Sequence, residues 1–521
     1  MLTEINLVLS PRDASDESFY KPLVAQNLKI DDSRITRIQI LRRSIDARQR
    51  NIKINMRFRV AYDEAFPELK LSDFSYQNVS GKPKVIVVGA GPAGLFAALR
   101  LIELGYCPIV LERGKRVEDR KKDLASIHKN KVIDPDSNYS FGEGGAGTFS
   151  DGKLYTRSKK RGNLKKILEV LHFHGAQEDI LIDAHPHIGT DVLPKVIVKI
   201  RESILSAGGE VRFSTKVNQL LVKDDKISGV RIKSGEEFLA EAVILATGHS
   251  ARDIYYLLDS QKIKIEAKTF AMGVRVEHPQ KLIDQIQYHN PKGRGEYLPA
   301  SSYSFVQQVD KRGVYSFCMC PGGVIVPAAT GPNQQVVNGM SSSRRNTAFA
   351  NSGMAVEIWE EDLKGFEKYG ALAGLKFQEE LEALAFEKGG SNLTAPAQRM
   401  LDFVKGIASS DLPASSYQPG LKSSALHEWL PKHISFRLQE GFKVFGNKSK
   451  GFLTNDAVIL AVESRTSSPV RIPRDVKSFQ HVQVAGLFPC GEGAGYAGGI
   501  VSAAMDGERC AEAFNTMMLD S

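Results

Sequence analysis

The chain has 521 residues, more than a single hydrophobic core supports, so we expect three or four folded units. Hydrophobic residues make up 42% and charged residues 25%, a mixture typical of soluble globular proteins. No stretch approaches the roughly 20 uncharged apolar residues that span a bilayer, and the first residues do not resemble a secretory signal. Five cysteines in so long a chain exclude a disulfide scaffold, and we expect a cytoplasmic location.

The net charge of +9 is gathered in two basic clusters. The first runs from Arg34 to Arg59, where only Asp46 opposes it, and includes Arg37, Arg42, Arg43, Arg48, Arg50, Lys53 and Arg57. The second consists of Lys153, Arg157, Lys159, Lys160, Arg161, Lys165 and Lys166. Such clusters attract anions, from nucleotide phosphates to nucleic acid, or they simply form a solvated surface.

Residues 1–75 predict a small α+β domain with the order β-α-β-β. We expect a strand at 5–10 and a helix at 16–28 that is capped by Ser15 or Asp16. Two strands at 34–43 and 51–62 follow, because apolar and charged residues alternate there. In the last strand the inward face is Ile52, Ile54, Met56, Phe58 and Val60, and the outward face is Lys53, Asn55, Arg57 and Arg59. The polar segment 63–82 predicts a linker.

From Lys84 the pattern is that of a Rossmann-type α/β fold. Its expected elements are strands at 84–88 and 107–112, helices at 95–104 and 192–207, a strand at 209–214 and a strand meander at 217–247. A mixed stretch resembles an inserted α+β substrate domain, with strands at 269–278, 314–320 and 335–341 and a helix at 365–388. The predicted boundaries are 83–262 and 461–521 for the dinucleotide-binding domain and 263–460 for the inserted domain.

A glycine-rich turn, Gly89-Ala90-Gly91-Pro92-Ala93-Gly94, follows the first strand and opens the next helix. Gly89 permits a tight turn, Gly91 lets the backbone approach a pyrophosphate, and Gly94 allows close packing of helix on strand. The start of the helix offers unpaired N–H groups to the phosphates. Glu112 ends the second strand, where it can accept hydrogen bonds from ribose and would repel the 2′-phosphate of NADP.

Three further stretches indicate FAD rather than NAD. Glu112-Arg113-Gly114, with Arg120 beyond, resembles the ribose-to-pyrophosphate edge of flavoproteins of the glutathione-reductase type. The stretch Ala246-Thr247-Gly248 resembles the short ATG element of that class, and residues 486–507 resemble its C-terminal flavin motif. In that motif Glu492 replaces the usual aspartate at the ribityl chain. The helix that begins near Gly498, Gly499 and Ile500 would stabilise negative charge on a reduced flavin.

The segment 141–157, FGEGGAGTFSDGKLYTR, is too rich in glycine for a stable helix or strand. We expect this loop to pack on the isoalloxazine and the pyrophosphate; the alternative is a flexible surface loop. The predicted FAD-binding residues are Gly89, Ala90, Gly91, Pro92, Ala93, Gly94, Glu112, Arg113, Arg120, Gly145, Ala146, Gly147, Thr148, Ser150, Val217, Ala246, Thr247, Gly248, Gly491, Glu492, Gly498, Gly499 and Ile500.

Five unusual strings run along the chain: FGEGGAGTFSDGKL, SFCMCPGG, NGMSSSRRN, VESRTSSPVR and FPCGEGAGYAGGI. Together they resemble a bacterial family described as uncharacterised FAD-dependent, or NAD(FAD)-utilising, dehydrogenases. The resemblance covers almost the whole chain and implies FAD binding without an established substrate.

Few side chains can be assigned a catalytic role from the sequence, because the flavin itself carries out hydride or electron transfer. Cys318 and Cys320, two residues apart on a predicted strand, should face the same side, as a redox pair, as half a metal site or as structural thiols. With no companion cluster we predict no metal. His185, His187 and His249 are proton shuttles or strand-end caps, and Cys490 is expected to pack. Arg465 is the catalytic candidate, near the isoalloxazine, and Arg471 a second anion-binding candidate.

The sequence therefore favours an FAD-dependent oxidoreductase that acts on a small organic molecule in the pocket between the FAD-binding and inserted domains. Between the ATG element and the C-terminal motif there is no second GxGxxG unit, so the electron donor is expected to be NAD(P)H without a Rossmann unit, or a protein. The alternatives are a flavoprotein that acts on or binds RNA through its basic N-terminal domain, and a flavin-binding regulatory protein without turnover. No membrane partner is expected.

Overall fold

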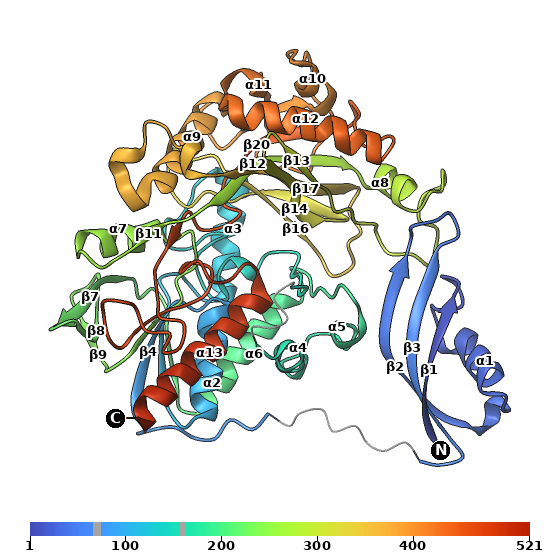
Figure 1. Ribbon diagram of the computed structural model, residues 1–521, viewed down its shortest axis with the longest axis horizontal. Coiled ribbons are helices and arrows are strands. Elements are labelled where there is room, and N and C mark those ends of the chain that lie inside the picture. Colours follow the sequence, from blue (N-terminus) through green and yellow to red (C-terminus); the bar gives the residue numbers. More distant parts are fainter. Residues whose placement is uncertain (66–73, 157–161, 521) are drawn as a thin grey trace.

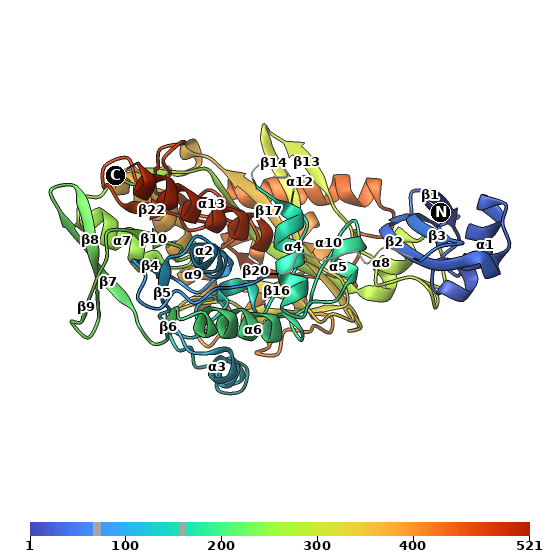
Figure 2. The same cartoon turned by 90° about the horizontal axis from the view of Figure 1, so that it is seen from below.

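The computed structural model describes residues 1–65, 74–156 and 162–520. A parallel sheet with its helices forms the lower part of Figure 1, and a larger sheet with outer helices lies above it. A small three-stranded sheet stands at one end of the long axis, opposite the β7–β9 meander (Figure 2). The expected fold class, a Rossmann-type α/β fold with additional α+β units, is confirmed. Part of the predicted linker, 66–73, and residues 157–161 of the second basic cluster lie outside the described residues.

The N-terminal unit has the predicted order of elements. These are β1 (Leu2–Leu9), α1 (Glu17–Leu28), β2 (Ile35–Asp46) and β3 (Lys53–Tyr62). The strands form an antiparallel sheet in the order β1-β3-β2. The inward residues Ile54, Met56, Phe58 and Val60 are buried, as the alternation predicts. Of the two expected helix caps, Asp16 is the one used, since its carboxylate accepts a hydrogen bond from the backbone N–H of Ser18 at 2.9 Å.

The outward face of this sheet is less basic than the sequence suggested. Glu4 on β1 accepts hydrogen bonds from the guanidinium groups of Arg57 and Arg59, at 2.5 and 2.8 Å. Arg34 is paired with Asp63. Acids from outside the stretch 34–59, Glu4 and Asp63, therefore oppose the cluster in addition to Asp46.

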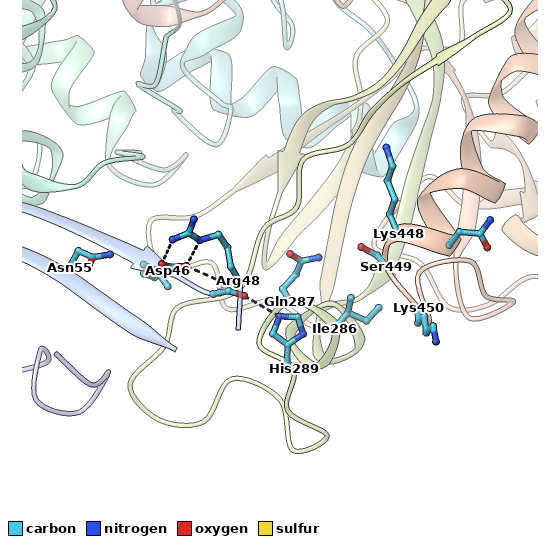
Figure 3. A pocket seen from close by; sticks show the side chains of 12 residues that line it. Asp46, Arg48, Asn55, Ile286, Gln287, His289, Lys448, Ser449 and Lys450 are labelled. Carbon is cyan, nitrogen blue, oxygen red and sulfur yellow. Dashed lines mark hydrogen bonds and ion pairs between the residues drawn. The ribbon is translucent and has the colours of Figure 1, made fainter. Parts of the chain in front are cut away.

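The N-terminal unit docks on the rest of the chain through the end of its β2–β3 hairpin. The guanidinium of Arg43 donates to Asp183 at 2.8 Å, and the Arg43 carbonyl accepts from the backbone N–H of Ala184. A ring nitrogen of His289 lies 3.0 Å from the carbonyl of Ala47. Beside this contact is an open hollow of about 1000 Å³, with the hairpin on one side and residues 286–289 and 447–450 on the other (Figure 3).

The central sheet is parallel throughout, in the order β22-β10-β4-β5-β6. Its strands are β4 (Lys84–Val88), β5 (Cys107–Leu111), β6 (Glu210–Arg212), β10 (Val243–Leu245) and β22 (Leu487–Pro489). One face packs on α2 (Pro92–Glu103), α6 (Leu193–Ser206) and α13 (Ile500–Leu519). The other face packs on α7 (Arg252–Ser260) and the meander of β7 (Val217–Lys223), β8 (Lys226–Ile232) and β9 (Glu237–Leu239). Further helices are α3 (Val117–Asn130), α4 (Leu164–Phe173) and α5 (Asp179–Ile182).

The upper sheet has seven strands in the order β13-β14-β17-β12-β20-β18-β19. They are β12 (Phe270–Pro279), β13 (Val306–Val309), β14 (Arg312–Cys320), β17 (Phe349–Ile358), β18 (Ala395–Arg399), β19 (Leu421–Ser423) and β20 (Val458–Glu463). Its core includes side chains of the helices α9 (Ala373–Gly389), α10 (Met400–Lys405), α11 (Leu426–Trp429) and α12 (Lys432–Lys448), which lie above it in Figure 1. Smaller elements are α8 (Gln280–Gln287), β11 (Glu266–Ala267), β15 (Gly323–Pro327), β16 (Val337–Ser341) and β21 (Val470–Arg471).

One predicted helix starts later than expected. The helix predicted at 365–388 begins at Ala373, because residues 367–372 form a 3-10 segment interrupted by Gly370 at φ +52°. None of the described helices combines the length and the apolar character that crossing a bilayer needs.

Helices α2 and α13 pack closely because a glycine lies at their contact. A Cβ atom on Gly507 would lie 2.0 Å from the carbonyl oxygen of Ala93. We expect Gly507→Ala to lower the free energy of unfolding by about 1–3 kcal/mol, since the two helices would have to separate. Thermal denaturation measures this loss. Gly331→Ala is the matched control, since its Cβ would come no closer than 3.8 Å to another heavy atom, and equal melting temperatures of the two variants would contradict the prediction.

Candidate functional site

A pocket of about 390 Å³ opens where the carboxyl ends of the parallel strands meet the seven-stranded sheet. Open α/β sheets bind ligands at this edge. Eighteen of the residues predicted to bind FAD line it: Gly89, Gly91, Pro92, Ala93, Glu112, Arg113, Gly145, Ala146, Gly147, Ser150, Val217, Ala246, Thr247, Gly248, Glu492, Gly498, Gly499 and Ile500. The fold thus brings together segments that lie up to about four hundred residues apart in the chain.

The other five predicted residues lie behind the pocket wall. They are Ala90, Gly94, Arg120, Thr148 and Gly491. Arg120 is fully buried and donates to the carbonyls of Asn138, Tyr139 and Glu143 at 2.7–3.0 Å, so it fixes the glycine-rich loop from behind. Ala90 donates its backbone N–H to Glu112, and Thr148 donates its hydroxyl to the carbonyl of Glu143, at 2.8 Å each. A Cβ on Gly94 would lie 1.9 Å from the Gly89 carbonyl oxygen, which confirms the close helix–strand packing expected there.

Glu112 does more than the sequence suggested. One carboxylate oxygen accepts the backbone N–H of Ala90 at 2.8 Å, and the other accepts those of Gly114 and Gly142 at 2.9 and 3.0 Å. The side chain therefore joins the first glycine turn, the exit of β5 and the 141–152 loop. It also lines the pocket, where contact with a ribose stays a prediction.

Part of the pocket wall consists of glycine backbone without side chains. A large planar or phosphorylated ligand could approach the chain closely there. A Cβ atom on Gly248, Gly498 or Gly499 would meet no heavy atom of the described chain within 4 Å, although all three line the pocket. The N-caps of α2 and α13 are Gly91 and Gly499, which have no side chain that could bind the N–H groups of the first turn. The residues present thus fit a dinucleotide with its phosphates at a helix N-terminus.

The wall of the pocket opposite the glycine turns, the upper wall, contains residues that are not among the twenty-three predicted FAD-binding residues. They are Asp151, Lys153, Tyr155, Phe317, Cys318, Asn338, Gly339 and Thr466. Lys153 belongs to the second basic cluster and also to the segment 141–157, which the sequence predicts to pack on the flavin. Its membership of that segment is the sequence signal that places it at the pocket.

Asp151 and Lys153 belong to a partly buried charge cluster on this wall. The guanidinium of Arg345 donates to both carboxylate oxygens of Asp151, at 3.0 and 2.6 Å. Burial alone would raise the pKa of Asp151, but the charges of Lys153 and Arg345 hold it below its usual value. The ammonium group of Lys153 donates to the carbonyl of Met319 and lies 3.8 Å from Asp151.

Arg465, the catalytic candidate, does line the pocket, but its guanidinium is largely occupied. It donates to both oxygens of Glu382 at 3.2 and 3.0 Å, to Thr330 at 2.8 Å and to Gln334 at 3.0 Å. Arg252 binds the same carboxylate, and the two cations keep the pKa of buried Glu382 at about 2. Arg471, the other candidate, is exposed, lies over the ring of Tyr496 and does not line the pocket.

His249 and Glu492 form a second polar group on the pocket wall. The imidazole Nε2 lies 3.5 Å from one carboxylate oxygen, and the other oxygen accepts the backbone N–H of Gly499. Burial lowers the pKa of His249, which favours a neutral ring that can accept or pass on a proton. His185 and His187 lie outside the pocket lining. The ring of His185 lies 4.8 Å from that of Tyr155 at a tilted angle, and a ring nitrogen of His187 lies 3.1 Å from the Ser343 carbonyl.

The two cysteines of β14 do not share an environment. The strand bulges between Phe317 and Cys320, and Cys318 adopts a left-handed φ of +48°. Cys318 is exposed and lines the pocket, whereas Cys320 is fully buried, which raises its pKa to about 11. The expectation that both thiols face one side is wrong, because the bulge breaks the two-residue alternation.

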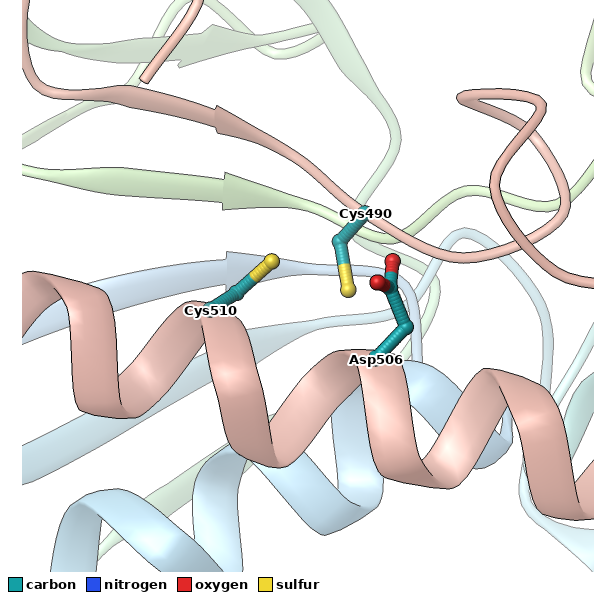
Figure 4. Close-up of side chains that lie close together, drawn as sticks. All are labelled: Cys490, Asp506 and Cys510. Atoms are coloured by element: carbon teal, nitrogen blue, oxygen red, sulfur yellow. The ribbon is translucent and has the colours of Figure 1, made fainter. Parts of the chain in front are cut away.

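Cys490, which lines the pocket, converges with Asp506 and Cys510, and their ligand atoms lie within 4.8 Å of one another (Figure 4). Arg474 donates to both oxygens of Asp506 at 3.0 and 2.6 Å and lies 3.4 Å from the sulfur of Cys510. The guanidinium already supplies the positive charge that a metal would bring. Hydrogen bonding to Cys510 and burial also raise the pKa of Cys490 well above its usual value. The cluster therefore favours neutral packed thiols, as expected for Cys490.

Two parts of the chain match known protein families. Residues 269–466 match "FAD-dependent protein, C-terminal domain-like", and residues 1–61 match a "Domain of unknown function (DUF8436)". An uncharacterized protein of Clostridium beijerinckii is 41% identical over 530 residues, which cover 98% of this chain and 97% of the relative. The chain belongs to this family of FAD-dependent proteins. FAD is accordingly the cofactor, as the sequence predicted, whereas the glutathione-reductase-type subclass and the dehydrogenase reaction stay predictions.

More distant similarities concern parts of the chain or the fold. A thiamine thiazole synthase of Methanococcus maripaludis is 27% identical over 189 residues, 34% of this chain and 60% of that protein. The solved structure of the flavin-dependent brominase Bmp2 covers 84% of this chain and 79% of its own, with 14% identity and a TM-score of 0.37. A geranylgeranyl bacteriochlorophyll reductase-like protein of Thermoplasma acidophilum covers 84% and 80%, with 12% identity and a TM-score of 0.34. Likenesses at these TM-scores do not define the chemistry of this family.

The open space beside Gly498 gives a direct test of the FAD pocket. We expect Gly498→Val to weaken FAD binding tenfold or more, because the new side chain would occupy space that the backbone leaves to the cofactor. The melting temperature of the apoprotein should change little, since no described heavy atom lies within 4 Å of the new Cβ. Titration of apoprotein with FAD, followed by flavin fluorescence, measures the affinity. Gly331→Val, outside the pocket lining, is the control, and unchanged affinity in Gly498→Val would contradict the assignment.

Proposed function

We propose that this protein is an FAD-dependent oxidoreductase that acts on a small organic substrate. One observation carries the proposal: a single pocket is lined on one side by the glycine turns of the parallel sheet and on the other by residues of β14, β16 and the 150–155 loop. Bound FAD supplies the group that takes up or gives a hydride or electrons. The opposite wall, with Lys153, Phe317 and Asn338, is then in position to bind and orient the substrate.

The chain's own residues divide the remaining work. The first turn of α2 and the 145–147 backbone would hold the pyrophosphate, and the first turn of α13 would stabilise negative charge on the flavin. Neutral His249, next to Glu492, is the group on the wall that can hold or pass on a proton.

The electron donor is proposed to reach the flavin without a second Rossmann unit. The described part of the chain contains one parallel sheet of the Rossmann type, and its glycine turn is already committed to the FAD pocket. NAD(P)H bound at the pocket mouth and a protein donor both fit this arrangement. Action on RNA is not favoured, because Glu4 pairs with Arg57 and Arg59 on the basic face and Lys166 pairs with Glu103 and Glu508.

The central experiment is anaerobic reduction of the bound flavin. Holoprotein is mixed with NADH, with NADPH and with pools of small metabolites, and bleaching of the flavin absorbance is followed. We expect at least one pool or nicotinamide to bleach the flavin, and a second pool to restore the absorbance. A flavin that none of them reduces, in a protein that is folded and loaded with FAD, would favour the regulatory alternative.

Arg465 is expected to position the pocket wall rather than to react. Arg465→Ala should lower the free energy of unfolding by about 1–3 kcal/mol, because four hydrogen bonds to buried partners are lost. Arg465→Lys keeps a charge beside Glu382 but loses the fork that reaches Thr330 and Gln334. We expect it to fold and to slow flavin reduction. Thermal denaturation and stopped-flow reduction measure the two effects; wild-type rates in Arg465→Lys would exclude the role.

A further inference from the structure

Two buried carboxylates next to the pocket are each shared by two cations. Asp151 is held by Arg345 and lies near Lys153, and Glu382 is held by Arg252 and Arg465. In each cluster the cation that lines the pocket, Lys153 or Arg465, therefore has no carboxylate of its own. A positive charge that is partly removed from water and has no counter-ion of its own is unfavourable in free energy. A bound anion would offset this desolvation penalty.

The two cations differ in how many of their N–H donors are free to bind a ligand. The guanidinium of Arg465 donates four hydrogen bonds, to Glu382, Thr330 and Gln334. Lys153 has three N–H donors, of which one meets the neutral carbonyl of Met319, and Asp151 at 3.8 Å is beyond hydrogen-bonding distance. The side chain is 35% exposed, and it lines the pocket. Lys153 is thus the better placed of the two to receive a ligand.

The other titratable groups around Lys153 do not supply the missing negative charge. Asp151 has both of its oxygens bound to Arg345, and burial raises the pKa of Cys320 to about 11, so that thiol stays neutral. Burial and Arg345 lower the pKa of His187, which leaves that ring neutral as well. The other two carboxylates of the pocket lining are also engaged, Glu492 with Gly499 and His249, and Glu112 with three backbone N–H groups.

We propose that the substrate is a small organic carboxylate and that the ammonium group of Lys153 binds its carboxylate. The inference deepens the proposed oxidoreductase function and rests on it. The cluster of Asp151, Arg345 and Lys153 carries one positive charge in excess, which matches a monoanion. A phosphate group would bring nearly two negative charges, and phosphate sites commonly use an arginine fork or a helix N-terminus, neither of which is free at Lys153. Tyr155 and Phe317, on the same wall, offer apolar contacts to the rest of the molecule.

The test measures ligand binding to the resting holoprotein, independently of turnover. Acetate, benzoate and succinate are titrated into FAD-loaded protein, next to the neutral amides acetamide, benzamide and succinamide and to inorganic phosphate. Perturbation of the flavin absorbance and fluorescence gives the dissociation constants. We expect at least one carboxylate to bind about tenfold or more tightly than its amide and than phosphate, since a hydrogen bond to a charged group accounts for this factor.

Variants assign the effect to one side chain. Lys153→Met should weaken the carboxylate about tenfold and leave the amide unchanged, while Lys153→Arg should retain most of the preference. The control Lys122→Met removes an equal charge from an 81% exposed position on α3 and should behave as wild type. FAD content and melting temperature are recorded for each variant. If Lys153→Met loses FAD or unfolds, the comparison of Lys153→Arg with Lys153→Gln replaces it.

The proposal is overturned if no carboxylate binds more tightly than its amide, or if phosphate binds more tightly than the carboxylates. It is also overturned if the Lys153 variants bind carboxylates with the same dissociation constants as the Lys122→Met control. Failure of the oxidoreductase proposal looks different, because it would leave anion binding intact in a protein whose flavin no donor reduces.

Discussion

The pocket depends on one carboxylate that accepts hydrogen bonds from the backbone N–H groups of three separate segments. Glu112 accepts N–H groups from Ala90, Gly114 and Gly142, so a single side chain fixes the first glycine turn, the end of β5 and the glycine-rich loop relative to one another. Glycine-rich segments lose much conformational freedom on folding and have few side chains to pack. Charge-assisted hydrogen bonds to Glu112 offset that loss at the point where the backbone must stand close to a ligand.

The two walls of the pocket are built on opposite principles. The lower wall is backbone, with glycines whose missing side chains leave room, and its polarity comes from N–H groups at the first turns of α2 and α13. The upper wall is made of side chains whose positions are set by buried ion pairs, such as Arg345 with Asp151 and Arg465 with Glu382. A lower wall of this kind suits one cofactor in many enzymes, whereas the upper wall can change with the substrate.

The sequence predicted the lower wall well and the upper wall poorly, for a physical reason. Short-range rules apply to the Gly89–Gly94 turn and to the alternation in β3, because neighbours in sequence set the conformation. The role of Lys153 depends on Met319 of β14 and on Arg345 in the loop between β16 and β17, and no local pattern predicts these contacts. The bulge in β14 is a similar case, since the alternation of Cys318 and Cys320 predicts a regular strand until the register with β17 is known. The basic face of the N-terminal unit was overestimated because Glu4 and Asp183 are remote in sequence from the arginines they pair with.

The lining of the pocket runs from Val88 to Ala503, so nearly the whole chain takes part in enclosing one small volume. Contacts between such distant segments form late in folding, because closing long loops costs entropy before any contact repays it. A ligand that bridges these segments binds the assembled protein and hardly any partly folded form, and it shifts the folding equilibrium by mass action. Supply of the cofactor should therefore govern how much of this protein accumulates in a cell, apart from how fast each molecule works.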